Sequence, residues 1–297
     1  MIKTTPSALA WDQWAAANGV AVLNVPVGFK EIAAMLRKVE ARLAADADAP
    51  VVVEDVYGQT VSLGVQPRLI FAGEESSGMI TGPEELIRSQ GGRTALAMRE
   101  KSAGEAMVLV TALAARCKQE GIALSDYLAD VFTANRITAT YDVREEITYY
   151  NESEPDPEKL RAAKQEGEAK RDKNDIFFLG IAIALHEGKI DLEQARELFA
   201  DALPALDFTT LEDVRFVGDG TYLKFRDKFV EVRKSGTDAK TKAYASGVDR
   251  ADCQRFAKAF GETSGELTEL YEARIGPSYL AEVEAKARRI YDAFQST

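Results

Sequence analysis

The sequence predicts an α/β domain, with a mixed sheet and flanking helices, followed by a smaller α+β domain. Strand-like and helix-like segments alternate over residues 1–140, which is the pattern of an α/β domain. The composition changes near Arg144 and becomes rich in Glu, Lys, Asp and Pro, and short strands and turns follow at 212–245. Because a length of 297 residues favours two domains, we expect domains at 1–140 and 141–297, with a charged insertion at 151–205.

The elements of the first domain follow from apolar periodicity. Residues 31–44 predict a helix, because Ile32, Leu36 and Val39 recur at intervals of three and four. The elements expected up to residue 72 are, in chain order, a strand at 2–5, a helix from 6 to 19, a strand at 20–25, this helix and a strand at 68–72.

Residues 105–118 predict a strongly apolar helix. A helix that is apolar on all sides is normally buried. We therefore expect this helix to lie between the sheet and a neighbouring element, with Met107, Leu109 and Leu113 in the core.

The second domain is predicted to mix helices with short strands. Opposite charges spaced along Pro157–Lys173 indicate a solvated helix. The turn sequence Gly218-Asp219-Gly220 is typical of a β-hairpin. The other expected elements are an apolar segment at 176–184, an amphipathic helix at 191–203, a strand at 229–232, and helices at 249–259 and 277–294.

Composition and charge exclude several classes of function. A net charge of −11 argues against nucleic acid as a partner, because nucleic-acid binding needs a basic face. No apolar run approaches the ~20 residues of a membrane helix, and the N-terminus does not resemble a targeting signal. Cys117 and Cys253 have no metal or redox spacing, so we expect free thiols in a cytoplasmic protein without a membrane partner. His186 is expected to be a surface or helix-end residue.

The segment 233–240 could form a cradle for a phosphate group. It follows a strand and joins one glycine and two hydroxyls to flanking cations. Gly236 permits a tight turn, while Ser235, Thr237 and the backbone N–H groups can converge on anionic oxygens. Arg233 can add a bidentate contact to the phosphate, and Lys240 can add a point charge. A solvated hairpin with scattered polar residues has a similar composition, so both interpretations stay open at this point.

A second candidate site is the loop 73–78, which follows the carboxyl end of a predicted strand. Open α/β sheets bind ligands at such ends. Glu74 could accept hydrogen bonds from two sugar hydroxyls, and Ser76 can both donate and accept. The alternative is that Glu74 or Glu75 caps a helix that follows.

Four segments together resemble the α-D-phosphohexomutases, the family of phosphoglucomutase and phosphomannomutase. They occur in the family's order over most of the chain. These segments are Val27-Gly28-Phe29-Lys30, the sugar-loop sequence Gly-Glu-Glu-Ser-x-Gly at 73–78, Arg99-Glu100-Lys101, and the phosphate-loop sequence Arg-x-Ser-Gly-Thr-x-x-Lys at 233–240.

The resemblance implies a reversible phosphoryl shift between C1 and C6 of a hexose, through a phosphoserine enzyme and a bisphosphorylated sugar. It implies that Glu74 and Ser76 hold sugar hydroxyls, and that Lys101 approaches the phosphate or the sugar ring. Lys30 is a further substrate contact by the same resemblance. The phosphate that is not reacting would be held by Arg233, Ser235, Gly236, Thr237 and Lys240.

The family has four domains, and this chain resembles only the third and fourth. The third is expected to be truncated at its start. A serine in a Thr/Ala-Ser-His-Asn-Pro context is missing, so we expect no catalytic nucleophile in this chain. An Asp-Gly-Asp-x-Asp-Arg loop is missing too, so we expect no metal site here, although the complete enzyme should need Mg²⁺.

We therefore expect the substrate-recognition half of a phosphohexomutase, inactive without an N-terminal half that carries the serine and Mg²⁺ loops. Its ligand would be glucose or mannose 1- or 6-phosphate. The first alternative is a non-catalytic phosphosugar-binding or regulatory module, and the second is a fold remnant without a ligand. A split enzyme should also expose an apolar face for its other half, expected near Ile2, Trp11 and Trp14.

Two matched motifs depart from the family pattern. Lys234, Asp238 and Ala239 stand where the family usually has proline, glutamate and proline, so the phosphate loop should be less rigid. Ser102-Ala103 replaces Asp-Gly after Lys101, which leaves the direction of the Lys101 side chain open.

Overall fold

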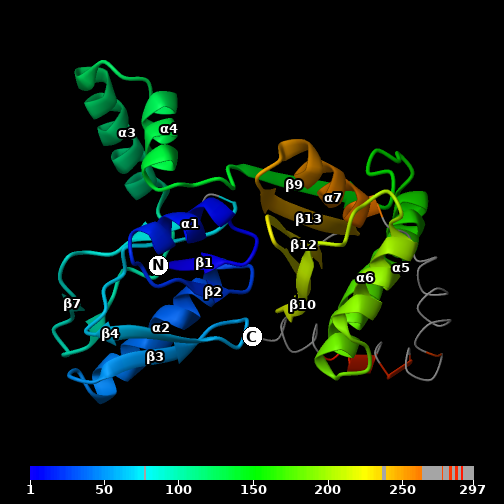
Figure 1. Cartoon of the computed structure of the whole chain (residues 1–297), viewed down its shortest axis with the longest axis horizontal. Coiled ribbons are helices and arrows are strands. Elements are labelled where there is room, and N and C mark those ends of the chain that lie inside the picture. Colours follow the sequence, from blue (N-terminus) through cyan, green and yellow to red (C-terminus); the bar gives the residue numbers. More distant parts are fainter. Residues whose placement is uncertain are drawn as a thin grey trace. The chain divides into compact units, whose positions relative to one another are not determined.

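A computed structural model confirms the predicted fold class, with an α/β unit and an α+β unit (Figure 1). The structure describes residues 1–76, 78–235 and 239–262, and a few isolated positions beyond them. The chain divides into two compact units, Met1–Thr140 and Tyr141–Thr297.

Unit 1 contains a four-stranded mixed sheet in the order β2-β1-β5-β6. β1 pairs in parallel with β2 and β5, which aligns Ile2 with Leu23 and with Ala72. The fourth strand, β6, runs antiparallel to β5. The strands are β1 (Ile2–Thr4), β2 (Leu23–Val25), β5 (Phe71–Gly73) and β6 (Met79–Thr81).

Helices α1 (Leu9–Ala17) and α2 (Phe29–Ala45) connect these strands where the periodicity predicts helices. The apolar stripe of α2, with Ile32, Leu36 and Val39, is buried against the sheet. The sequence did not reveal two small hairpins that complete the unit. They are β3 (Pro50–Glu54) with β4 (Thr60–Val65), and β7 (Ile87–Arg88) with β8 (Thr94–Ala95).

The predicted apolar helix forms as α3 (Ala103–Glu120), but its expected burial is wrong. Figure 1 shows α3 and the following α4 (Leu124–Ala134) as a helical hairpin standing away from the unit 1 sheet. Met107 is 69% exposed and Leu109 is 43% exposed, while Leu113 is half-buried. Among the described elements, its main contacts are with α4 and with the edge strand β6, and these leave much of its apolar surface uncovered.

The apolar face expected near the first strand is not exposed. Ile2 is buried in the unit 1 core. Trp11 is half-buried and its ring packs edge-on against Phe71, with 5.0 Å between ring centroids. The large exposed apolar side chains of unit 1 lie mainly on α3 and α4 instead.

Unit 2 is built on a five-stranded antiparallel sheet in the order β10-β11-β12-β13-β9. The predicted hairpin at Gly218 is present, with Val217 opposite Gly220 across a two-residue turn. The strands are β9 (Tyr141–Thr148), β10 (Leu211–Val217), β11 (Gly220–Phe225), β12 (Lys228–Lys234) and β13 (Lys240–Gly247).

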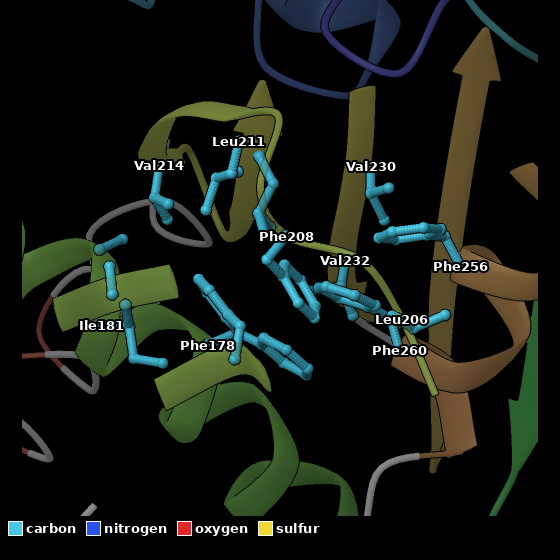
Figure 2. Close-up of a cluster of buried hydrophobic side chains, with 14 of the residues drawn as sticks. Phe178, Ile181, Leu206, Phe208, Leu211, Val214, Val230, Val232, Phe256 and Phe260 are labelled. Carbon is cyan, nitrogen blue, oxygen red and sulfur yellow. The ribbon is translucent and has the colours of Figure 1, made fainter. Parts of the chain in front are cut away.

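The helices of unit 2 within the described residues are α5 (Pro157–His186), α6 (Leu192–Ala202) and α7 (Arg250–Glu262). The helix predicted to end at Lys173 continues without a break to His186. Its second part is buried in the core, where Phe178 stacks on Phe260 of α7 with 4.8 Å between ring centroids. Figure 2 shows side chains of α5, α7 and β12 meeting in this core.

The remaining predictions concern the end of the chain and membrane insertion. The helix predicted at 277–294 lies outside the described residues, apart from a few isolated positions. No helix among the described residues combines the length and the apolar character that a membrane span requires.

Candidate functional site

Three of the predicted substrate residues meet at the carboxyl end of β5. The buried carboxylate of Glu74 is only 6% exposed, and its Oε1 accepts hydrogen bonds from two side chains. Ser76 Oγ donates over 2.9 Å and Lys101 Nζ over 3.0 Å. Lys101 comes from a separate motif and is 53% exposed, so it reaches Glu74 from the solvent side. We call Glu74, Ser76 and Lys101 the Glu74 site.

Close approach explains the two glycines of this loop. A Cβ atom on Gly73 would lie 2.7 Å from the Phe71 ring, and one on Gly78 would lie 2.7 Å from Glu74 Oε1. Such distances are below van der Waals contact, so any larger residue would displace the ring or the carboxylate. The loop is closed by Glu74 N–H, which donates to Gly78 O over 3.0 Å.

The start of α3 positions Lys101. Ser102 is the N-cap residue of α3, and its Oγ accepts from Glu105 N–H over 3.1 Å. The Glu105 carboxylate in turn accepts from Thr81 N–H on β6 over 3.0 Å. Serine can cap a helix, so the departure from Asp-Gly at this point keeps a defined helix start directly after Lys101.

The other predicted residues of unit 1 have different partners. Lys30 is at the start of α2, and its Nζ lies 3.8 Å from Glu31. The neighbouring ring of Phe29 lies 5.7 Å from Lys101 Nζ. Arg99 Nε donates to Glu40 over 3.1 Å, which ties the 99–101 segment to α2.

The alternative interpretation of Glu74 and Glu75 as helix caps is wrong. The loop leads into strand β6, not into a helix. Glu75 Oε2 accepts from Thr4 Oγ1 over 3.0 Å, so this carboxylate ties the loop to the end of β1.

In unit 2, the first cation of the predicted phosphate segment is buried in an ion pair. Arg233, near the end of β12, donates from Nε and Nη2 to the two carboxylate oxygens of Asp219, over 3.0 and 2.9 Å. Both side chains are largely buried. Burial alone would lower the pKa of Arg233, but the hydrogen bonds and charge of Asp219 outweigh it and raise that pKa.

We call the segment 233–240 the anion loop. Its remaining described residues close the base of the loop. Ser235 N–H donates to Lys240 O over 2.8 Å. Lys234 Nζ lies 3.9 Å from Asp172, and Lys240 Nζ lies 2.7 Å from Glu152. Gly236 and Thr237, which were expected to hold the phosphate, lie outside the described residues.

Helix α5 packs closely against the anion loop. A Cβ atom on Gly167 would lie 3.3 Å from the Cβ of Ala239, so the glycine allows the helix to approach the loop. One turn further on, Arg171 Nη1 donates to Ser235 O over 3.2 Å. Arg171 also pairs with Asp172 on the same helix, with 2.8 Å between Nη2 and Oδ1.

Asp175 lies deeper on the same side of α5. Its carboxyl is buried, and both oxygens lack a hydrogen-bond partner among the described residues. Burial raises its pKa well above the usual range of an aspartate. The positive charges of Lys234 and Arg171 oppose this rise, while the negative charges of Asp172 and Asp219 add to it.

The sequence motifs did not indicate the acidic partners of the cations in the anion loop. Asp219 was interpreted only as a hairpin residue, and Asp172 and Glu152 only as members of a solvated charged segment. For Asp219, a signal was its place in a tight turn beside a predicted strand. Nothing in the sequence indicated that α5 would bring Asp172 to Lys234, because that contact depends on tertiary packing.

The remaining titratable candidates show ordinary structural roles. His186 lies exposed at the end of α5, as expected, and packs edge-on against Phe216. Cys117 and Cys253 are free and buried. Within the described part of the chain, no three histidine, cysteine or acidic side chains are grouped so that they could hold a metal ion.

Comparisons with known proteins show a distant structural likeness. No family model matches the sequence, and no curated protein matches it. Among solved structures, the chain is similar to a provisionally named phosphomannomutase from Thermus thermophilus, with 15% identity and a TM-score of 0.43. The match covers 90% of this chain but only 36% of that chain. A likeness of this size assigns neither a family nor a function.

Proposed function

We propose that this chain recognises a phosphorylated hexose and is the substrate-recognition half of a phosphoglucomutase- or phosphomannomutase-type phosphohexomutase. The observation that carries the proposal is the meeting of Glu74, Ser76 and Lys101 at the end of β5. These residues come from two motifs that are separate in the sequence. The family resemblance assigns both motifs to the same substrate.

The Glu74 site has the chemistry that a sugar needs. Without a ligand, the Ser76 hydroxyl and the Lys101 ammonium satisfy Glu74 Oε1. Two adjacent sugar hydroxyls could replace them as donors, so no buried acceptor would be left unpaired. Because Lys101 is half-exposed, it can move toward a phosphate or a ring oxygen without disturbing the core.

The anion loop would supply the phosphate contacts, through Arg233, Ser235, Gly236, Thr237 and Lys240. Phosphoryl transfer depends chiefly on positioning and on charge stabilisation, which cations and backbone N–H groups provide. The bidentate pair with Asp219 engages Nε and Nη2 of Arg233, so Nη1 is the nitrogen that this pair leaves for a ligand.

The reaction itself requires a second polypeptide segment. We propose that an N-terminal half supplies the nucleophilic serine and the carboxylates for Mg²⁺, and that this chain alone does not interconvert glucose or mannose 1- and 6-phosphates. The free buried thiols of Cys117 and Cys253 favour a cytoplasmic location for such an enzyme.

Titration calorimetry with glucose 1-phosphate and the full chain tests the sugar contact. Glu74→Gln should weaken binding at least about 10-fold, because a hydrogen bond to a charged acceptor is lost. Glu75→Gln is the matched control and should bind as the unaltered chain does, since Glu75 serves Thr4 instead. Equal effects of the two substitutions would overturn the assignment of Glu74.

Complementation tests the reaction. Adding an N-terminal half that carries the serine and Mg²⁺ loops should produce Mg²⁺-dependent conversion of hexose 1-phosphate to 6-phosphate. Binding without any conversion in the presence of a verified, folded complement would favour a non-catalytic phosphosugar-binding module.

A further inference from the structure

The ion pairs around the anion loop differ strongly in burial. Arg233 and Asp219 are 13% and 5% exposed, so water hardly reaches this pair. Lys240 and Glu152 are 21% and 50% exposed, and their charged atoms lie 2.7 Å apart. Glu152 belongs to the turn before α5, whereas Asp219 belongs to the hairpin between β10 and β11.

Burial decides which of these pairs a ligand can open. Removing one partner of a buried pair leaves an uncompensated charge in the protein interior, which is strongly unfavourable. A pair with a half-exposed carboxylate contributes less, because water solvates that carboxylate when the two charges separate. The Glu152 carboxylate can therefore leave Lys240 at small cost, while Asp219 stays with Arg233.

We propose that Glu152 occupies the anion-binding position at Lys240 and that a phosphate binds by replacing it. This inference rests on the proposed function and names a regulation of the same site. Glu152 pairs with the Lys240 ammonium until a more strongly charged anion replaces it. No covalent step is involved, because one anion exchanges for another on the same ammonium group.

Charge selects the class of ligand. A phosphate monoester carries about 1.5 to 2 negative charges near neutral pH, against one for a carboxylate. The ammonium of Lys240 therefore gains from the exchange when the incoming group is a phosphate. A small carboxylic acid carries no more charge than Glu152, and it would compete poorly with a side chain held in place by the chain itself.

The second acidic neighbour of the loop is not exchanged in the same way. Asp172 lies 3.9 Å from Lys234 but also accepts from Arg171 over 2.8 Å. Arg171 in turn binds Ser235 O. Asp172 and Arg171 therefore hold the base of the loop, and Glu152 is the carboxylate that yields.

Titration calorimetry with inorganic phosphate tests the exchange on the full chain. Glu152→Gln should bind phosphate about two- to five-fold more tightly, since the competing carboxylate of a partly exposed pair is gone. Glu158→Gln removes the same charge from the first turn of α5 and is the matched control. It should change the affinity much less than Glu152→Gln does.

A double-mutant cycle separates exchange at Lys240 from a general change of charge. In a Lys240→Met background, Glu152→Gln should no longer tighten phosphate binding, because the position it opens has lost its cation. Unchanged or weaker binding by Glu152→Gln would overturn the exchange while leaving the proposed function in place. Saturable phosphate binding by none of the variants would overturn the anion site and the exchange together.

Discussion

The Glu74 site and the anion loop both hold their charges in ion pairs, but the cation is exposed in the first pair and buried in the second. In the Glu74 site the carboxylate is buried and its cation, Lys101, is half-exposed. In the anion loop the cation Arg233 is buried together with Asp219. A ligand can rearrange the first pair by moving an exposed lysine. The second pair is part of the framework, so the carboxylate that a ligand can readily replace at this loop is Glu152, on Lys240.

Breaking the buried pair should have the largest effect on stability. Asp219→Asn should lower the free energy of unfolding by about 3–5 kcal/mol, because Arg233 would stay buried without its bidentate partner. Urea unfolding followed by circular dichroism measures the change. Glu166→Gln breaks an exposed pair with Lys170 on α5 and should leave the unfolding curve unchanged. If the two variants unfold alike, the contrast between buried and exposed pairs is wrong.

The buried acid beside the anion loop gives the next largest effect. The pKa of Asp175 is raised by burial, so the folded chain keeps this proton at pH values where the unfolded chain has lost it. Stability therefore falls as the pH rises above about 4, the unfolded pKa, and levels off above the folded pKa. Asp175→Asn removes this loss and should therefore stabilise the chain at pH 7.

The pH dependence provides the check on that prediction. The advantage of Asp175→Asn should shrink as the pH is lowered toward 4, where the aspartate is protonated in both states. Thermal unfolding at several pH values measures it. A variant that is less stable than the original chain at pH 7, and relatively better at pH 4, would contradict the assignment of a raised pKa.

Removing the exposed lysine of the Glu74 site should have the smallest effect on stability. Lys101→Met should cost less than about 1 kcal/mol, because the ammonium is 53% exposed and contributes as a surface pair does. Lys118→Met, in the exposed last turn of α3, the helix that follows Lys101, is the control. A loss as large as that of Asp219→Asn would mean that the two sites do not differ as their burial indicates.

Sequence periodicity predicted elements well and burial less well. The segments 106–115, within the helix predicted at 105–118, and 176–184 are both uncharged and apolar. The second is buried in the unit 2 core, whereas the first exposes Met107 and Leu109. Hydropathy shows that a helix gains from burial, but it does not show that a partner surface exists within the chain. The charged first part of the long helix α5 was predicted as a helix. Its apolar second part looked like a separate element, so the continuation was missed.

The candidate site shows the same division. Glu74, Ser76 and Lys101 were predicted from local motifs, and each motif brings its residue to a loop or a helix start. Asp219 and Glu152 were not assigned to the site, because they pair with Arg233 and Lys240 from other elements. Such partners depend on strand register and helix packing, which a single sequence does not specify.

The central claim is that this chain binds a phosphorylated hexose without a catalytic half. Calorimetric titration of glucose 1-phosphate into the full chain tests it most directly. The account predicts saturable binding that is weakened by Glu74→Gln and by Lys240→Met, and is unaffected by Glu75→Gln. The absence of binding at millimolar glucose 1-phosphate by a folded chain would contradict it.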